Sequence, residues 1–302
     1  MTEPLDRKRA RVSGGGLAYV DEGEGPAVVL LHGYPTSAHL WRDVVPILAP
    51  RFRAIAPDLL GYGDSEKPKD APVHIRAQAG YVRELLDGLE VRAFAAVGHD
   101  IGGGVAQLLA FDGGVEALVL IDSISLDSWP IEGVRMLQQA DPEEVDEEFA
   151  TALVRTTFDL GMSRRAHLAE EDLDEFARPW REDPRALIRA ARGIDGVGLA
   201  GTEARLEALD VRTLLLWGED DPFLTSEQAE RLGGLLPGST TALLPGCSHF
   251  VTEDAPEATL PLIAEYLRIH YLGASHAHAG PTPIDLGVSF HRPEHPGTPN
   301  GG

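Results

Sequence analysis

The sequence contains little that would support several large classes of function. It has one cysteine, Cys247, among 302 residues, so it forms no intramolecular disulfide and no cysteine-based metal site. No apolar run approaches the roughly 18 residues that cross a bilayer. Residues 1–12 are charged and have no apolar segment behind them. These absences are typical of a cytoplasmic protein without a membrane anchor.

Positive charge is also scarce. The chain has 26 Lys and Arg against 48 Asp and Glu, which gives a formal net charge of -22. Such a charge repels phosphate backbones and anionic lipid heads. We therefore expect neither nucleic acid nor a membrane as a partner, while a homo-oligomer stays open.

Short β-rich runs alternate with longer amphipathic stretches, the pattern of a parallel sheet covered by helices on both faces. The strand candidates are residues 27–31, 53–57, 93–98, 116–121, 213–217 and 240–244. The helix candidates lie near residues 39–49, 74–90, 101–111, 226–236 and 256–271. Upstream of them, residues 14–25 contain Gly and acidic turn residues and predict an antiparallel edge hairpin.

The alternation stops between residues 124 and 208, which hold charged, helix-prone segments and no convincing strand. We therefore expect a core of residues 1–124 and 209–272, with residues 125–208 inserted as a helical unit over the sheet. Residues 273–302 are rich in Gly, Pro and His and lack periodicity, which predicts a flexible tail.

One acidic residue stands where a strand candidate meets a helix candidate. The segment Gly98-His99-Asp100-Ile101-Gly102 predicts a sharp turn with Asp100 at its centre, a position where neighbouring glycines avoid Cβ clashes. Unpaired N–H groups at the helix start would stabilise a negative charge there. A simpler interpretation is that Asp100 only caps the helix.

Two more groups follow in the order nucleophile, acid, base. The base candidate is His249, in the loop after the last strand candidate, and the acid candidate is Asp221, at the end of the strand before it. Asp122 ends another strand and is a second candidate for the acid. The loop after the first buried strand can turn the N–H of Tyr34 toward Asp100, where it would join the N–H of Ile101 as an oxyanion hole.

Four segments together resemble the α/β-hydrolases, and within them the aspartate-nucleophile branch of haloalkane dehalogenases and epoxide hydrolases. The segments are HGYPTSAHLWRDVVPILAPRFRAIAPDLLGYGDSEKP, GHDIGG, WGEDD and GCSHF. The resemblance covers about residues 15–124 and 209–271. It implies the α/β-hydrolase fold, with a mostly parallel eight-stranded sheet and a helical cap inserted after the sixth strand. By its Gly-x-x-Asp pattern it also selects Asp221 as the acid.

An aspartate nucleophile suits an electrophilic sp3 carbon, because attack there gives an ordinary ester, whereas attack on an ester or amide would give a high-energy anhydride. We expect Asp100 to form that ester and His249, oriented by Asp221, to activate the water that hydrolyses it. The only partners would be a small apolar substrate and water, with no cofactor and no metal.

The leaving group separates the two branches. Epoxide hydrolases of this fold use cap tyrosines to protonate an alkoxide, and residues 82–265 contain no tyrosine, although Tyr34 or His167 could substitute. Carbon–halogen cleavage is thus the first hypothesis, with Trp129 and Trp180 as candidate halide donors. Epoxide hydrolysis is the alternative, and a non-catalytic binding protein on the same fold is a third. Fluoroacetate dehalogenases hold a carboxylate with arginines after the nucleophile, and Ile101 and Gly104 do not supply them.

Overall fold

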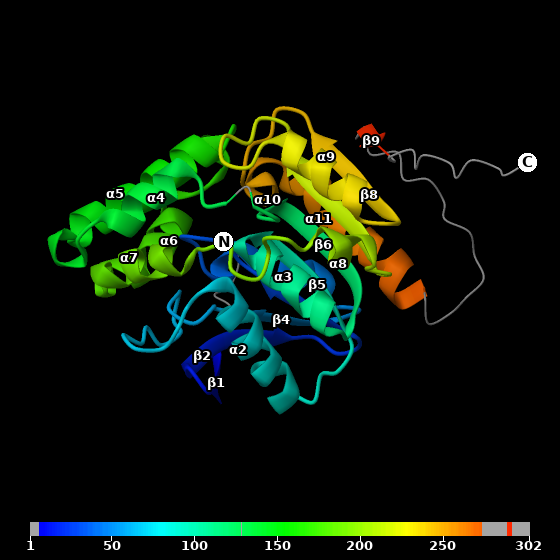
Figure 1. The fold of residues 1–302 in the computed structure, drawn as a ribbon, viewed down its shortest axis with the longest axis horizontal. Helices are drawn as coiled ribbons and strands as arrows, with labels where there is room; N and C mark the ends of the chain where they lie inside the picture. Colours follow the sequence, from blue (N-terminus) through cyan, green and yellow to red (C-terminus); the bar gives the residue numbers. More distant parts are fainter. Residues whose placement is uncertain (1–5, 128, 274–288, 292–302) are drawn as a thin grey trace, which may run out of the picture.

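The computed structural model describes residues 6–127, 129–273 and 289–291. Within these residues nine strands form one sheet, in the order β1-β2-β4-β3-β5-β6-β7-β8-β9 (Figure 1). The strands are β1 (Lys8–Val12), β2 (Gly15–Glu22), β3 (Ala27–Leu31), β4 (Arg53–Pro57), β5 (Phe94–Asp100), β6 (Val115–Ser123), β7 (Arg212–Gly218), β8 (Ser239–Leu244) and β9 (Ser289–His291). Strands β3 to β8 are mutually parallel, and the others are antiparallel to their neighbours. The mostly parallel, eight-stranded sheet is therefore present as β1–β8, and β9 extends its edge.

All six predicted strands form, as β3–β8. Every residue of β3 and β5 is buried, because helices cover both faces of a parallel sheet and leave no side of it to water. Leu31 of β3 pairs with Gly98 of β5, and Ile121 of β6 pairs with both His99 and Leu216. This register brings the carboxyl ends of four strands to one edge of the sheet, where α/β proteins bind ligands.

The predicted edge hairpin within residues 14–25 is wrong in its position. Most of that range is the single strand β2, which pairs upstream with β1 and on its other side with β4. In β1, Lys-Arg-Ala-Arg-Val, most side chains are exposed at the sheet edge, so only Ala10 and Val12 contribute an apolar signal. Of the predicted tail, residues 274–288 and 292–302 lie outside the described residues, and residues 289–291 form β9.

The helices that cover the sheet follow the predicted segments closely. They are α1 (Val44–Leu48), α2 (Ile75–Gly88), α3 (Ile101–Asp112), α9 (Ser226–Leu235) and α11 (Pro256–Leu267). Figure 1 shows α2, α3 and α9 in front of the sheet and α11 behind it. The helix expected near residues 39–49 is divided into a 3₁₀ turn, Ala38–Trp41, and α1. No helix in the described ranges is long and apolar enough to cross a membrane.

Between β6 and β7 the described residues form helices and no strand. These helices are α4 (Glu132–Gln139), α5 (Glu147–Gly161), α6 (Glu170–Glu182), α7 (Pro184–Gly193) and α8 (Glu203–Glu207). The sequence sets two of the starts: the carboxylate of Asp146 accepts the N–H of Phe149 at 2.8 Å before α5, and that of Asp183 accepts the N–H of Ala186 before α7. We call residues 125–208 the cap segment. Figure 1 shows α4–α7 as a group at one side of the sheet.

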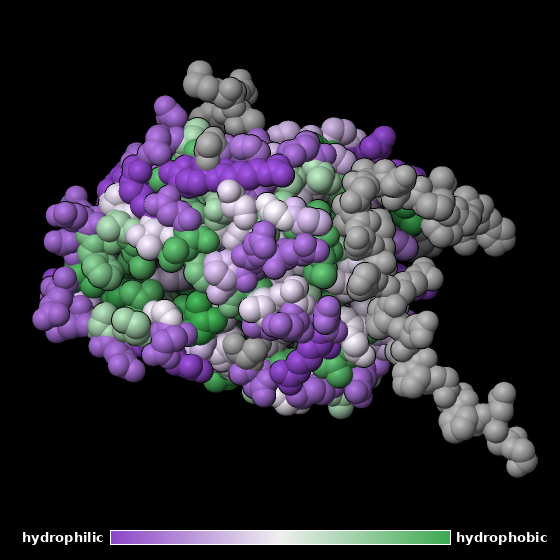
Figure 2. All heavy atoms as spheres, turned by 90° about the horizontal axis from the view of Figure 1, so that it is seen from above, coloured by the Kyte–Doolittle hydropathy of each residue, from purple (hydrophilic) through white to green (hydrophobic). Residues whose placement is uncertain are grey.

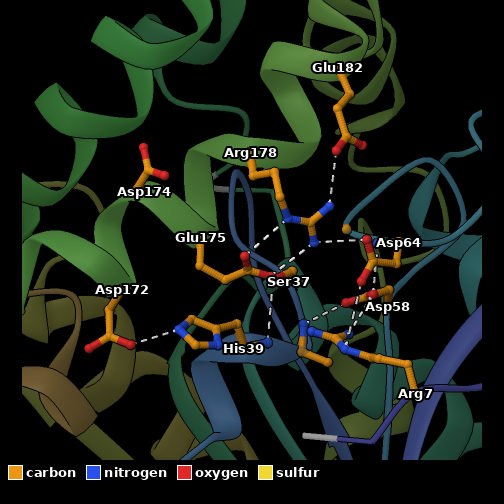
Figure 3. Close-up of polar contacts among 12 residues, drawn as sticks. Arg7, Ser37, His39, Asp58, Asp64, Asp172, Asp174, Glu175, Arg178 and Glu182 are labelled. Atoms are coloured by element: carbon orange, nitrogen blue, oxygen red, sulfur yellow. Dashed lines mark hydrogen bonds and ion pairs between the residues drawn. The ribbon is translucent and has the colours of Figure 1, made fainter. Parts of the chain in front are cut away.

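Charged side chains join the cap segment to the core (Figure 3). Arg178 of α6 donates to Asp64, in the loop after β4, at 2.8 Å. Asp172, also on α6, lies 2.9 Å from Nε2 of His39 and 3.1 Å from Nε of Arg42. These contacts hold α6 against the loops at the carboxyl ends of the strands.

Candidate active site

Asp100 lies in a strained turn between β5 and α3. Its φ of 53° and ψ of -120° place a non-glycine residue in a region that is costly for a side chain with a Cβ. The turn is also tight. A Cβ on Gly98 would lie 2.4 Å from the carbonyl oxygen of Gly102, and a Cβ on Gly102 would lie 2.1 Å from that of Leu31. Glycine is therefore required at both positions, and the packing around them holds the strain.

The carboxylate of Asp100 is bound by the two backbone groups that the sequence predicts. The N–H of Tyr34 donates to Oδ1 at 3.0 Å, and the N–H of Ile101 also hydrogen-bonds the carboxylate. The side chain makes no capping bond to the second or third N–H of α3. Asp100 thus points away from the helix and into a cavity, unlike an ordinary N-cap.

His249 and Asp221 lie beside it. Nδ1 of His249 is 2.9 Å from Oδ2 of Asp221, whose Oδ1 accepts the N–H groups of Phe223 and Leu224 at 2.8 and 3.0 Å. Nε2 of His249 is 3.9 Å from Oδ2 of Asp100, too far for a hydrogen bond. Asp221 therefore fixes the imidazole with Nε2 directed at Oδ2 of Asp100.

Burial and charge compete in the protonation of these groups. Burial raises the pKa of Asp100 to about 6, although the His249 charge and the N–H groups of Tyr34 and Ile101 act against it. Burial lowers the pKa of His249, but the charge and hydrogen bond of Asp221 and the charge of Asp100 outweigh it, so the net shift is upward. Above about pH 6 the Asp100 carboxylate is ionised.

Asp122, the second candidate for the acid, makes different contacts from Asp221. It lies one residue before the end of β6 with a φ of 39°, its Oδ1 accepts the N–H of Gly218 at 2.9 Å, and its Oδ2 has no hydrogen-bond partner in the described part of the chain. Burial, and then the charge of Asp221, raise its pKa well above the ordinary value. Oδ2 of Asp221 lies 2.9 Å from Nδ1 of His249, so the geometry favours Asp221 as the partner of His249.

Sequence reasoning missed two residues that position His249. Nε2 of His99 is 3.0 Å from the carbonyl oxygen of His249. The buried carboxylate of Asp254 accepts the N–H groups of Ser248 at 2.7 Å, Ser163 at 3.0 Å and Arg164 at 2.8 Å. Asp254 thereby ties the loop of His249 to the chain that follows α5. His99 lay within the quoted turn motif, whereas nothing near Asp254 in sequence indicates its contact with residues 163 and 164.

The edge of the sheet at which Asp100 and His249 lie opens into a cavity of about 420 Å³. It is lined by Tyr34, Asp100, Trp129, Ile131, Gly133, Val134, Met136, Leu137, Ala140, Phe149, Leu153, Thr156, Thr157, Leu160, Phe223 and His249. Most of these residues are apolar and come from the cap segment, and Asp100 and His249 are the only Asp, Glu, Lys, Arg or His side chains among them. A volume of this size suits a small organic molecule.

The two candidate tryptophans differ. Trp129 lines the cavity, is 7% exposed, and its indole Nε1 has no hydrogen-bond partner among the described residues. The prediction for Trp180 is wrong: its Nε1 donates to the carbonyl oxygen of Pro35 at 2.6 Å, so this N–H is already engaged. His167 is engaged as well, because its Nδ1 is 3.1 Å from the carbonyl oxygen of Asp254.

Reactive thiol chemistry has no support here. Burial raises the pKa of the Cys247 thiol to about 11, so the thiol is protonated at neutral pH. In the described ranges, no group of three or more His, Cys, Asp and Glu side chains could hold a metal ion.

Comparison with known proteins agrees with this geometry. Residues 26–256 match the family model of the alpha/beta hydrolase fold. The soluble epoxide hydrolase of Corynebacterium sp. is 34% identical over 284 residues, which cover 85% of this chain and 95% of that protein. Haloalkane dehalogenase 2 of Mycobacterium bovis is 29% identical, covering 87% and 95%. A solved α/β-hydrolase fold protein from Burkholderia ambifaria superposes with a TM-score of 0.79 at 28% identity, covering 85% and 97%.

Proposed function

Because the chain belongs to the α/β-hydrolase fold family, we propose that it is a hydrolase that cleaves a carbon–halogen bond through a covalent ester of Asp100. The observation that carries the proposal is the carboxylate at the strained turn. The N–H groups of Tyr34 and Ile101 hold the carboxylate of Asp100, and its Oδ2 lies 3.9 Å from Nε2 of His249. A carboxylate so placed can attack without first losing a proton, which a serine cannot.

In the first step Oδ2 of Asp100 attacks the carbon that bears the halogen. The halide leaves with the bonding electron pair, and the product is an alkyl ester of Asp100. This step needs no proton transfer, so it requires only an ionised Asp100 and a donor for the departing halide.

In the second step His249 acts as the base. Esterification removes the negative charge of Asp100, which lowers the pKa of the imidazole and frees Nε2 to accept a proton. Nε2 deprotonates a water that attacks Cγ of Asp100, and the N–H groups of Tyr34 and Ile101 stabilise the oxyanion on Oδ1. Collapse releases the alkoxide, which takes the proton from His249 and leaves as the alcohol. Asp100 is left as the carboxylic acid and loses the second water proton to solvent, so each turnover releases one alcohol, one halide and one proton.

Trp129 supports a halide as the leaving group. An indole N–H that lacks a partner when buried loses about 1–3 kcal/mol of hydrogen bonding, which a halide in the cavity would recover. The cap segment has no tyrosine to protonate an alkoxide.

Epoxide hydrolysis is the second candidate. The hydroxyl of Tyr34 donates to the carbonyl oxygen of Leu187 over 3.4 Å, a long bond that an epoxide oxygen could replace. The identity to an epoxide hydrolase supports the same candidate. Burial raises the pKa of Tyr34, so the hydroxyl stays protonated and able to donate.

The test compares 1-bromobutane with 1,2-epoxybutane, with bromide and diol release as the measurements. Trp129→Phe keeps the ring but loses the N–H, and we expect it to lower kcat/KM for the bromide by about 10- to 100-fold. Trp41→Phe is the matched control, because Trp41 also has a buried N–H without a partner among the described residues but does not line the cavity. Turnover of the epoxide alone, sensitive to Tyr34→Phe, would replace the first candidate with the second. Turnover of neither would favour a binding protein.

A further inference from the structure

Helix α5 carries two apolar stripes, and only one packs into the protein. The buried stripe consists of Ala150, Val154, Phe158 and Gly161. The second stripe consists of Phe149, Leu153, Thr157 and Leu160, and it lines the catalytic cavity. Its ends are open to water, with Phe149 40% and Leu160 60% exposed. A surface helix normally turns one apolar stripe to the core and polar residues to solvent, so the second stripe needs an occupant.

The surface facing this stripe is apolar too. Met136 of α4, 66% exposed, lines the same cavity with Leu137 and Val134. The hydroxyl of Thr157 donates to the carbonyl oxygen of Leu153 at 2.9 Å, so its donor is satisfied within the helix. Figure 2 shows apolar residues gathered round a hollow on the side where the cap helices lie. We call the space between α4 and the second stripe of α5 the apolar groove.

The groove begins at the catalytic residues. The N–H of Phe250, next to His249, donates to the carbonyl oxygen of Gly161 at 3.0 Å, and a Cβ on Gly161 would lie 2.8 Å from the Phe250 ring. The carboxyl end of α5 is therefore fixed beside His249, and the second stripe runs away from it. From Leu160 to Phe149 the helix rises about 16 Å. An extended chain advances about 1.2 Å per bond, so the groove matches a chain on the order of a dozen atoms.

We infer that the substrate is an uncharged molecule with a long, linear alkyl chain, bound with its reactive carbon at Asp100 and its chain along the apolar groove. The inference rests on the proposed function, because the catalytic end of the groove is the proposed nucleophile. The continuity of the cavity from Asp100 and His249 to Met136 and Phe149 supports a substrate chain as the occupant. Apart from those two catalytic residues, no charged side chain in the described part of the chain lines the cavity to bind an ionic group.

The test measures binding without chemistry. Linear 1-alkanols from butanol to decanol, kept below their solubility limits, are titrated into the full chain by calorimetry. Each methylene that leaves water strengthens binding by up to about fourfold, so we expect Kd to fall roughly 100-fold or more across the series. Met136→Glu and Leu160→Glu place a charge on exposed positions of the groove and should flatten that dependence. Val197 is a cap residue that is 55% exposed and outside the cavity. Val197→Glu should therefore leave the dependence of Kd on chain length and the catalytic activity unchanged.

A Kd that stops falling after butanol or pentanol would overturn the inference, as would an unchanged slope in both groove variants. If these variants instead change the oligomeric state in sedimentation velocity and keep the dependence of Kd on chain length, the exposed residues of the groove contact a second copy of the chain and not a substrate. The alkanols have no halide or epoxide and cannot react. The absence of a chain-length dependence would therefore refute the inference alone, whereas a failure of ester formation with 1-bromobutane would refute the proposed function.

Discussion

Asp100 is buried at a site that disfavours its charge, so removal of that charge should stabilise the fold. Its pKa is about 6 in the folded protein and 3.8 in an exposed reference, a difference of about two units. At 1.36 kcal/mol per unit this corresponds to about 3 kcal/mol of free energy of unfolding. The folded state favours protonated Asp100, so this stability is fully present below pH 3.8 and is lost as the pH rises through 6.

Asp100→Asn keeps the size of the side chain and removes the charge. At pH 8 we expect the variant to unfold with a free energy about 3 kcal/mol higher than the wild type in urea, and with a Tm higher by roughly 6 °C. At pH 4.5 the gain should shrink to about 1 kcal/mol, because wild-type Asp100 is then protonated in the folded state. Exposed Asp70→Asn controls for the loss of one negative charge from a chain of net charge -22. Equal stability of Asp100→Asn and the wild type at pH 8 would refute the reasoning, as would a gain no larger than that of Asp70→Asn.

Further predictions concern the groups around Asp100. The kcat/KM for a bromoalkane should fall tenfold per pH unit below about pH 6, because protonated Asp100 cannot attack; a profile flat to pH 5 would contradict this. Asp221→Asn should slow ester hydrolysis by about 10²- to 10⁴-fold in stopped-flow experiments while the ester still forms. Asp122→Asn should change it less than tenfold, since Oδ1 of Asp122 accepts the N–H of Gly218 and it is Asp221 that holds Nδ1 of His249. The reverse order would make Asp122 the working acid. Asp254→Asn should lower the free energy of unfolding by about 3 kcal/mol in urea and reduce kcat, because the amide loses charge-assisted bonds to Ser248 and the cap segment; unchanged kcat would separate Asp254 from the positioning of His249.

The sequence predicts the central sheet well because its strands are buried on both faces and appear as short apolar runs. Residues 27–31 and 53–57 form strands with the predicted boundaries. Edge strand β1 was missed because exposure removes the apolar signal. The proximity of Asp100, His249 and Asp221 also follows from sequence, since each comes after a strand of one parallel sheet and all such ends meet at one edge.

The lining of the cavity could not be predicted in the same way. Whether Trp129 or Trp180 offers a free N–H depends on the position of the Pro35 carbonyl, a contact across 145 residues that no local pattern encodes. The two stripes of α5 overlap in sequence, and only the packing of the cap segment decides which of them is buried. The upward shift in the pKa of Asp100 also depends on burial from several segments, whereas the helix start alone predicts an ordinary carboxylate.

The most direct test of the central claim is intact-protein mass spectrometry of His249→Gln after incubation with 1-bromobutane. Ester formation needs Asp100 but not His249, whereas hydrolysis needs His249, so we expect one butyl group per chain, mapped by peptide analysis to Asp100. The double variant Asp100→Asn, His249→Gln should stay unmodified. A folded His249→Gln protein that gains no adduct from 1-bromobutane or 1,2-epoxybutane, or that carries the adduct on another residue, would contradict the assignment of Asp100 as the nucleophile.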